Sequence, residues 1–196
     1  MRVGTAVQSG ISVTDAQREV RLAFLGGFMG QAVSSMLWLA SAALATWGTP
    51  RQAITTLVVG GFFIFPATQA GLRLIGRSGT LRRDNPLGAL GMQVAFTLPL
   101  VLPLVGATAL YRLHWFYPAF MIALGAHYLP FVFLYGMPMF YALAGVLVAG
   151  GLALALYLPG SFSAGAWLTA VVLALFAVWG GRVAVSEERG QGGGSR

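Results

Sequence analysis

Four polar side chains lie deep inside long apolar stretches of this sequence: Gln31, Gln69, Gln93 and His127. A polar group without a partner in hydrocarbon costs several kcal/mol, so these side chains are expected to face one another, water or a bound solute. Histidine is the only one of these residue types that exchanges a proton near neutral pH. Their chemistry is therefore that of a site for a small polar solute, or that of hydrogen bonds between helices.

The stretches that hold these side chains have the length of membrane-spanning helices. A span needs about 20 apolar residues, and six windows meet this need: roughly 22–48, 53–76, 87–110, 114–135, 137–157 and 164–182. At about 1.5 Å of rise per residue, the four polar side chains fall roughly 4 to 8 Å to the cytoplasmic side of the midplane. The sequence predicts one polar layer, and the residues expected to lie close to it are Ser34, Ser35, Thr68, Thr97 and Tyr128.

The composition places the chain in the membrane class. Of 196 residues, 57% are hydrophobic and only 9% are charged, which leaves too little polar surface to cover a soluble globule. The formal net charge of +7 comes from arginines at the ends of the windows and in one short loop. That pattern is typical of membrane orientation and not of nucleic-acid binding. We therefore expect an all-α polytopic membrane protein, folded as a single six-helix bundle.

The expected organisation is a cytoplasmic N-terminal segment over 1–21, a transmembrane domain over 22–183 and a flexible cytoplasmic tail over 184–196. Thr14 and Gln17 have the spacing of a capping box, which would start a helix running into the first span. The connection over 76–86 is basic, so the positive-inside rule places it in the cytoplasm, and six spans then place both termini there. Its arginines are expected to set the topology, with anionic lipid headgroups as an alternative ligand: Arg77, Arg82 and Arg83.

Prolines interrupt three successive windows near their centres, so we expect kinked central helices. A proline inside a helix removes one backbone hydrogen bond and frees the carbonyl four residues earlier. Such carbonyls could complete a solute site, as in transporters with broken helices, or the prolines could simply shape the bundle. Both interpretations stay open for Pro66, Pro99, Pro103 and Pro130.

The inventory of reactive side chains argues against an enzyme. The windows contain no Asp, Glu or Lys, and the chain has no cysteine. Its two histidines, His114 and His127, would stand about 20 Å apart along one helix, too far for a shared metal ion. We expect no catalytic residue, no bound metal and no cofactor.

Several blocks of the sequence carry a resemblance. They are Gly60-Gly-Phe-Phe-Ile-Phe-Pro-Ala-Thr-Gln69, Asn85-Pro-Leu87, Trp115-Phe-Tyr-Pro118 and, most specific, Gly125-Ala-His-Tyr-Leu-Pro130. With them the chain, from about residue 17 to residue 177, resembles a family of small bacterial integral membrane proteins of unknown function. The resemblance implies a multi-pass protein of the bacterial cytoplasmic membrane, and it implies neither an activity nor site residues.

Three classes of function are compatible with these features. The sequence favours a transporter or channel for a small polar solute, with anions preferred over cations because arginines surround the cytoplasmic mouth. A structural or partner-binding membrane protein is the alternative, since small residues spaced four apart allow close helix packing. A membrane-embedded enzyme comes third. The expected partners are the lipid bilayer and a small polar solute, with no nucleic acid, and the sequence does not indicate an oligomeric state.

Overall fold

The computed structural model describes residues 11–158 and 160–192, and all regular structure in these residues is helical. The helices are α1 (Val13–Phe24), α2 (Phe28–Trp47), α3 (Pro50–Gly61), α4 (Ile64–Leu74), α5 (Leu87–Tyr111), α6 (Phe116–Tyr135), α7 (Met139–Tyr157) and α8 (Ala164–Gly192). Five segments are long and apolar enough to cross a membrane, with α1 and α2 counted as one, and the bent pair of α3 and α4 could be a sixth. The predicted all-α polytopic bundle is confirmed, and the last four windows match α5 to α8 closely at their first residues.

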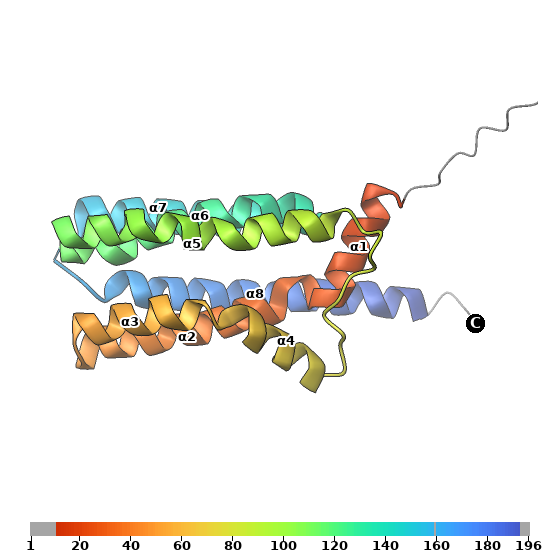
Figure 1. The fold of residues 1–196 in the computed structure, drawn as a ribbon, viewed down its shortest axis with the longest axis horizontal. Coiled ribbons are helices and arrows are strands. Elements are labelled where there is room, and N and C mark those ends of the chain that lie inside the picture. Colours follow the sequence, from red (N-terminus) through yellow and green to blue (C-terminus); the bar gives the residue numbers. More distant parts are fainter. Residues whose placement is uncertain (1–10, 159, 193–196) are drawn as a thin grey trace, which may run out of the picture.

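The long helices form two layers (Figure 1): α5, α6 and α7 in one, and α2, α3 and α8 in the other. The layers meet through buried aromatic side chains. The ring of Trp38 in α2 lies 5.9 Å from that of Tyr117 and 5.2 Å from that of Phe120, both in α6. Aromatic pairs at such distances add to the free energy gained from apolar burial. This cluster therefore holds α2 against α6 and sets their antiparallel register.

The first predicted span is broken in the structure. Leu25, Gly26 and Gly27 have φ values of 50°, 59° and 85° and separate α1 from α2. A left-handed backbone suits glycine because glycine has no Cβ. A Cβ at Gly26 would also lie 2.7 Å from the carbonyl oxygen of Gly180 in α8. The break therefore depends on glycine both for its conformation and for its close contact with α8.

The helix before this break also starts differently from the prediction. Its N-cap is Ser12, whose hydroxyl accepts the backbone N–H of Asp15 at 3.1 Å, and not Thr14. Ala16 and Val20 form its buried face, and α1 crosses the end of the bundle instead of running straight into the first span (Figure 1). The predicted N-terminal segment 1–21 is thus helical from Val13, and residues 1–10 lie outside the described part of the chain.

The second predicted span consists of two helices bent by 60° between Gly61 and Ile64. The sequence located the kink at Pro66, but that proline is the third residue of α4. The first N–H groups of a helix have no partner within it, so a proline is tolerated there. The bend thus precedes the proline, and α4 slants away from the long axis of the bundle (Figure 1). Pro99, Pro103 and Pro130 lie inside helices that continue past them.

The C-terminal boundary predicted at residue 184 is not a structural boundary. Helix α8 continues to Gly192, and its last turns are bound to the rest of the protein. Glu187 accepts a hydrogen bond from Arg21 of α1 at 2.9 Å, and Glu188 accepts one from Arg77 at 2.7 Å. Of the predicted flexible tail, residues 193–196 lie outside the described part of the chain.

Helix α1, the loop 75–86 and the last turns of α8 lie at one end of the bundle (Figure 1). We call it the basic end, because it carries Arg18, Arg21, Arg77, Arg82 and Arg83. Short connections, 48–49, 112–115 and the described residues 158 and 160–163 between α7 and α8, lie at the opposite end. The predicted placement of the loop and both terminal regions on one side of the membrane is compatible with this arrangement.

We expect the basic end to face the cytoplasm, because arginines next to spans are retained on that side. The chain has no cysteine, so Ser78→Cys, between α4 and α5, and Ser161→Cys, between α7 and α8, each introduce a single thiol. In intact cells a membrane-impermeant maleimide should label Ser161→Cys and leave Ser78→Cys unlabelled until the cells are permeabilised. Labelling of Ser78→Cys in intact cells would reverse the orientation.

Candidate functional site

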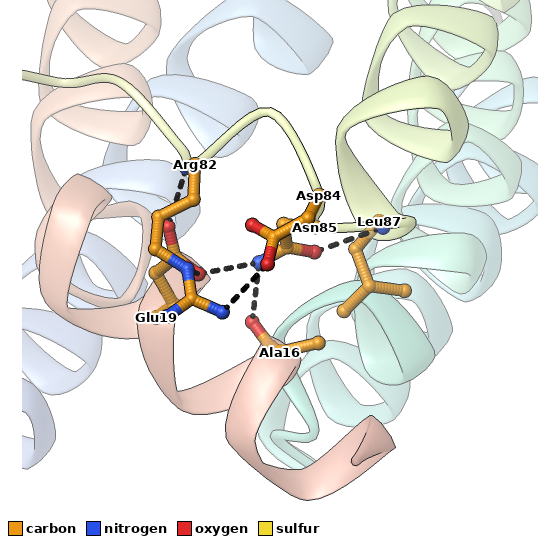
Figure 2. A network of polar contacts seen from close by, with 6 residues as sticks. All are labelled: Ala16, Glu19, Arg82, Asp84, Asn85 and Leu87. Carbon is orange, nitrogen blue, oxygen red and sulfur yellow. Dashed lines mark hydrogen bonds and ion pairs between the residues drawn. The ribbon is translucent and has the colours of Figure 1, made fainter. Parts of the chain in front are cut away.

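A polar network joins α1 to the loop before α5 (Figure 2). The carboxylate of Glu19 accepts the backbone N–H of Arg82 at 2.6 Å and the side-chain amide of Asn85 at 3.0 Å. The amide of Asn85 also donates to the carbonyl of Ala16 at 3.2 Å, and its Oδ1 accepts the N–H of Leu87 at 2.9 Å. Asn85 is buried, so these bonds meet the requirement that a buried amide be paired. The network fixes the entry of the chain into α5.

Helix α1 also covers the C-terminal end of α6. Gln17 Nε2 donates to the carbonyl of Phe133 at 2.6 Å, and Arg21 Nη1 donates to that of Tyr135 at 2.7 Å. The last carbonyls of a helix have no partner within it, and a cation beside them is favourable. Because Arg21 Nε also donates to Glu187 of α8, one side chain connects α1 to both layers.

The arginines predicted in the loop 76–86 mostly have partners at the basic end. Arg77 forms an ion pair with Glu188 of α8. Arg82 pairs with Asp84 at 3.1 Å, and Arg83 is exposed. These contacts favour a role in folding and orientation for the loop arginines.

A cleft of about 830 Å³ opens between α1 and the loop 75–86. Its apolar part is formed by Ile11, just before α1, and by Leu22 and Ala23 in the last turn of α1. Its charged part contains as many arginines as acids: Arg18, Arg77 and Arg82, with Asp15, Glu19 and Asp84. The cleft is therefore close to electrically neutral and reaches toward the break between α1 and α2.

The side chains predicted to form one polar layer lie in different environments. Gln93 is exposed on α5. Gln69 donates to the carbonyl of Gly79 at 3.1 Å and so belongs to the basic end. The predicted depths hold for straight spans only. Because the second span bends before α4, Gln69 lies outside the predicted layer. Two predicted residues remain: Gln31, in the first turn of α2, and His127, near the middle of α6.

The contacts between α2 and α6 bring these two residues into the same half of the bundle. Trp38 packs against Phe120, the ring of Tyr135 lies beside Gly27, and the helices run antiparallel (Figure 1). Counted from these two contacts, Gln31 lies opposite the stretch of α6 from His127 to Phe131. No hydrogen bond joins Gln31 to His127 in the described part of the chain.

The polar neighbour of His127 is Thr97 of α5. The imidazole Nδ1 lies 2.7 Å from Thr97 Oγ1, which also lies 2.7 Å from the carbonyl oxygen of Val94. This pair joins α5 to α6. The adjacent Tyr128 is buried and stacks on Phe140 of α7 at 6.1 Å between ring centroids.

The serines of α2 face the protein interior. Ser34 is buried, and Ser35 donates to the carbonyl of Ala170 in α8 at 2.8 Å. Ser41 is a further buried serine of α2 that was not among the predicted residues. Its hydroxyl lies 2.7 Å from that of Tyr117 and donates to the carbonyl of Ala53 in α3 at 3.0 Å. The available signal was its spacing, since Ser41 follows Ser34 by seven residues and lies on the same helix face.

Gln31 and Thr68 differ from these residues because they have no hydrogen-bond partner in the described part of the chain. Both amide atoms of Gln31 and the hydroxyl of Thr68 are enclosed and unpaired, and the two residues are only 3% and 9% exposed. A Cβ at Gly30 would lie 3.8 Å from Thr68 Oγ1. Thr68 Oγ1 therefore lies beside the first turn of α2, the turn that also carries Gln31.

Two further enclosed polar atoms without partners lie at the opposite end of the bundle. They are His114 Nε2 and Trp115 Nε1, in the turn before α6. Among the described residues, no group of three or more His, Asp or Glu side chains is arranged to hold a metal ion. The unpaired atoms near Gln31 are thus the polar groups best placed for a ligand inside the membrane.

Comparison with known proteins gives one match. The model of a family of unknown function (DUF7010) matches residues 13–181, from the start of α1 into α8. No curated protein and no solved structure matches the chain.

Replacing Glu19 by alanine should loosen α1, because it removes the acceptor of two hydrogen bonds from the loop. Hydrogen bonds to a charged group are worth about 1.5 to 3 kcal/mol each, so the loss of two should lower the free energy of unfolding in detergent by about 3 kcal/mol. Hydrogen exchange of the α1 amides should accelerate. The matched control is Asp84→Ala, which removes an exposed ion pair worth at most about 1 kcal/mol. Equal losses in the two variants would contradict a special role for Glu19.

Proposed function

We propose that the chain, which belongs to the family of unknown function DUF7010, is a transporter or channel for a small polar solute. The observation that carries the proposal is the unpaired amide of Gln31, enclosed between helices and 3% exposed. The proposal places the protein in the cytoplasmic membrane of a bacterium, with the basic end inside the cell.

An amide enclosed without partners is costly. Leaving a buried donor or acceptor unsatisfied costs about 1 to 3 kcal/mol, and Gln31 leaves one of each. The neighbouring Thr68 hydroxyl adds a third unpaired atom. Other buried hydroxyls, such as those of Ser35 and Thr169, donate to backbone carbonyls. A solute that both donates and accepts hydrogen bonds would satisfy the groups that the helices leave unpaired.

Two helix breaks next to Gln31 support a binding role. Helix α2 begins at Phe28, three residues before Gln31, and α4 begins after the 60° bend, four residues before Thr68. The first N–H groups of a helix have no partner within it. Interrupted helices supply such groups to solute sites near the membrane centre in secondary transporters. The Gln31 site therefore combines side-chain and backbone hydrogen-bonding groups.

The cleft at the basic end provides an entrance. Leu22 and Ala23 of its apolar part lie directly before the break that precedes α2. Three acids oppose three arginines along its charged part, so the cleft offers no net attraction to either sign of charge. The anion preference inferred from the arginines alone is accordingly not part of the proposal. A small neutral polar solute fits a neutral cleft and an uncharged amide.

The proposal predicts opposite effects of Gln31→Met on transport and on stability. The variant removes both unpaired amide atoms at similar side-chain length, so the melting temperature should rise. Flux of the transported solute into proteoliposomes should fall at least tenfold, because the polar groups that bind it are gone. Flux is measured by stopped-flow light scattering with urea, acetamide and glycerol, and stability by thermal unfolding in detergent.

The matched control is Gln93→Met, since Gln93 is an exposed glutamine of α5. It should leave both flux and melting temperature unchanged. If wild-type vesicles are no more permeable than protein-free vesicles to every solute of the panel, the transport proposal is wrong. A Gln31→Met protein that melts at a lower temperature would instead identify Gln31 as a hydrogen-bonding link between helices.

A further inference from the structure

The hydrogen bonds around His127 determine which ring nitrogen carries its proton. A threonine hydroxyl has one hydrogen, and Thr97 Oγ1 lies 2.7 Å from both the Val94 carbonyl oxygen and His127 Nδ1. The carbonyl can only accept, so the Thr97 hydrogen points to Val94. The Thr97 oxygen must then accept a hydrogen from Nδ1. In a neutral imidazole with its proton on Nδ1, Nε2 is an acceptor with a free lone pair.

This second nitrogen is open to the outside of the bundle. Among the described residues, Nε2 has no hydrogen-bond partner and is not among the enclosed polar atoms. The ring is partly exposed between α5 and α6, next to exposed Ala126 and Leu129. His127 lies near the centre of α6, twelve residues into a 20-residue helix. At this depth its surroundings are lipid, so an unpaired acceptor there is costly.

The surroundings of the ring are aromatic. The His127 ring lies 5.2 Å from that of Phe131 and 5.7 Å from that of Tyr128, measured between centroids. On α5, Phe96 precedes Thr97 and is 59% exposed. Flat rings favour offset or edge contacts with other aromatic rings. The partner of Nε2 must therefore reach it through lipid, donate a hydrogen and pack against aromatic side chains.

We propose that His127 Nε2, on the side of α6 that meets α5, binds the aromatic O–H group of a lipid-soluble quinol. The ring of such a molecule would pack near Phe96 and Phe131, and its hydroxyl would donate to Nε2. The site faces lipid between α5 and α6, whereas Gln31 is enclosed where α2 meets α4 and α8, so this binding is independent of solute transport. The inference concerns binding alone and requires no electron transfer.

The experiment uses full-length protein in lipid nanodiscs with ¹⁵N-labelled histidine. Without ligand, the His127 resonances should show a protonated Nδ1 and an unprotonated Nε2. Titration with decylubiquinol should shift the Nε2 resonance, and the O-methylated diether of the same molecule should not, because it has no hydrogen to donate. A protonated Nε2 in the free protein, or equal responses to both molecules, would overturn the proposal.

Two variants test the same contact by affinity. His127→Asn keeps a donor near the position of Nδ1 for Thr97 but lacks an atom at the position of Nε2. It should keep the wild-type melting temperature within a few degrees and bind decylubiquinol at least tenfold more weakly. His114→Asn, at the opposite end of the bundle, is the control and should bind like wild type. Wild-type affinity in His127→Asn would refute the site, and the NMR comparison still decides if that variant does not fold.

Discussion

The cost of leaving polar groups unpaired in hydrocarbon is the constraint on which this structure depends. Within each helix the backbone N–H and C=O groups bond to one another. The groups that still need hydrogen-bond partners are therefore polar side chains and the backbone groups at helix ends. Ser35 donates to a carbonyl of α8, and Ser41 bonds to Tyr117 and to a carbonyl of α3. These bonds accompany the Trp38 cluster and tie α2 to its neighbours. The bundle is thus held by apolar packing, with polar contacts setting its register.

The same constraint explains the role of α1. The break at Leu25–Gly27 turns α1 across the basic end, where Gln17 and Arg21 satisfy the last carbonyls of α6. Arg21 and Arg77 reach the two acids of α8, and Glu19 holds the loop before α5. Charged side chains can do this because the helix ends lie where water and headgroups begin. The N-terminal helix is therefore a structural part of the bundle.

A few polar groups inside the bundle remain without a hydrogen-bond partner, although such groups are costly in hydrocarbon. Thr68 lies beside the first turn of α2, which carries Gln31, whereas His127, predicted at the same depth, is partly exposed between α5 and α6. One site is enclosed and near a cleft, and the other faces lipid. A solute from water suits the first and a lipid-soluble molecule suits the second, because each can be reached only from its own phase. Gln31 and His127, which the sequence predicts at equal depth in the membrane, thus have different surroundings.

The sequence alone determined the class of protein and the first residues of α5 to α8 within a few residues. Apolar length and the rise of a straight helix depend only on local chemistry, so they can be read from the chain. The tertiary structure decided which face each polar residue occupies. Gln93 is exposed, the amide of Gln69 in α4 donates to the carbonyl of Gly79 in the loop, and His127 contacts Thr97. The tertiary structure also set the positions of the two helix breaks. The turn at Gly26 depends on its contact with Gly180 of α8, and the bend after Gly61 comes before Pro66, where the sequence had predicted a kink. The direction of a helix and the face that it turns to its neighbours depend on contacts between residues far apart in the chain. The spacing of residues along one helix does not predict these contacts.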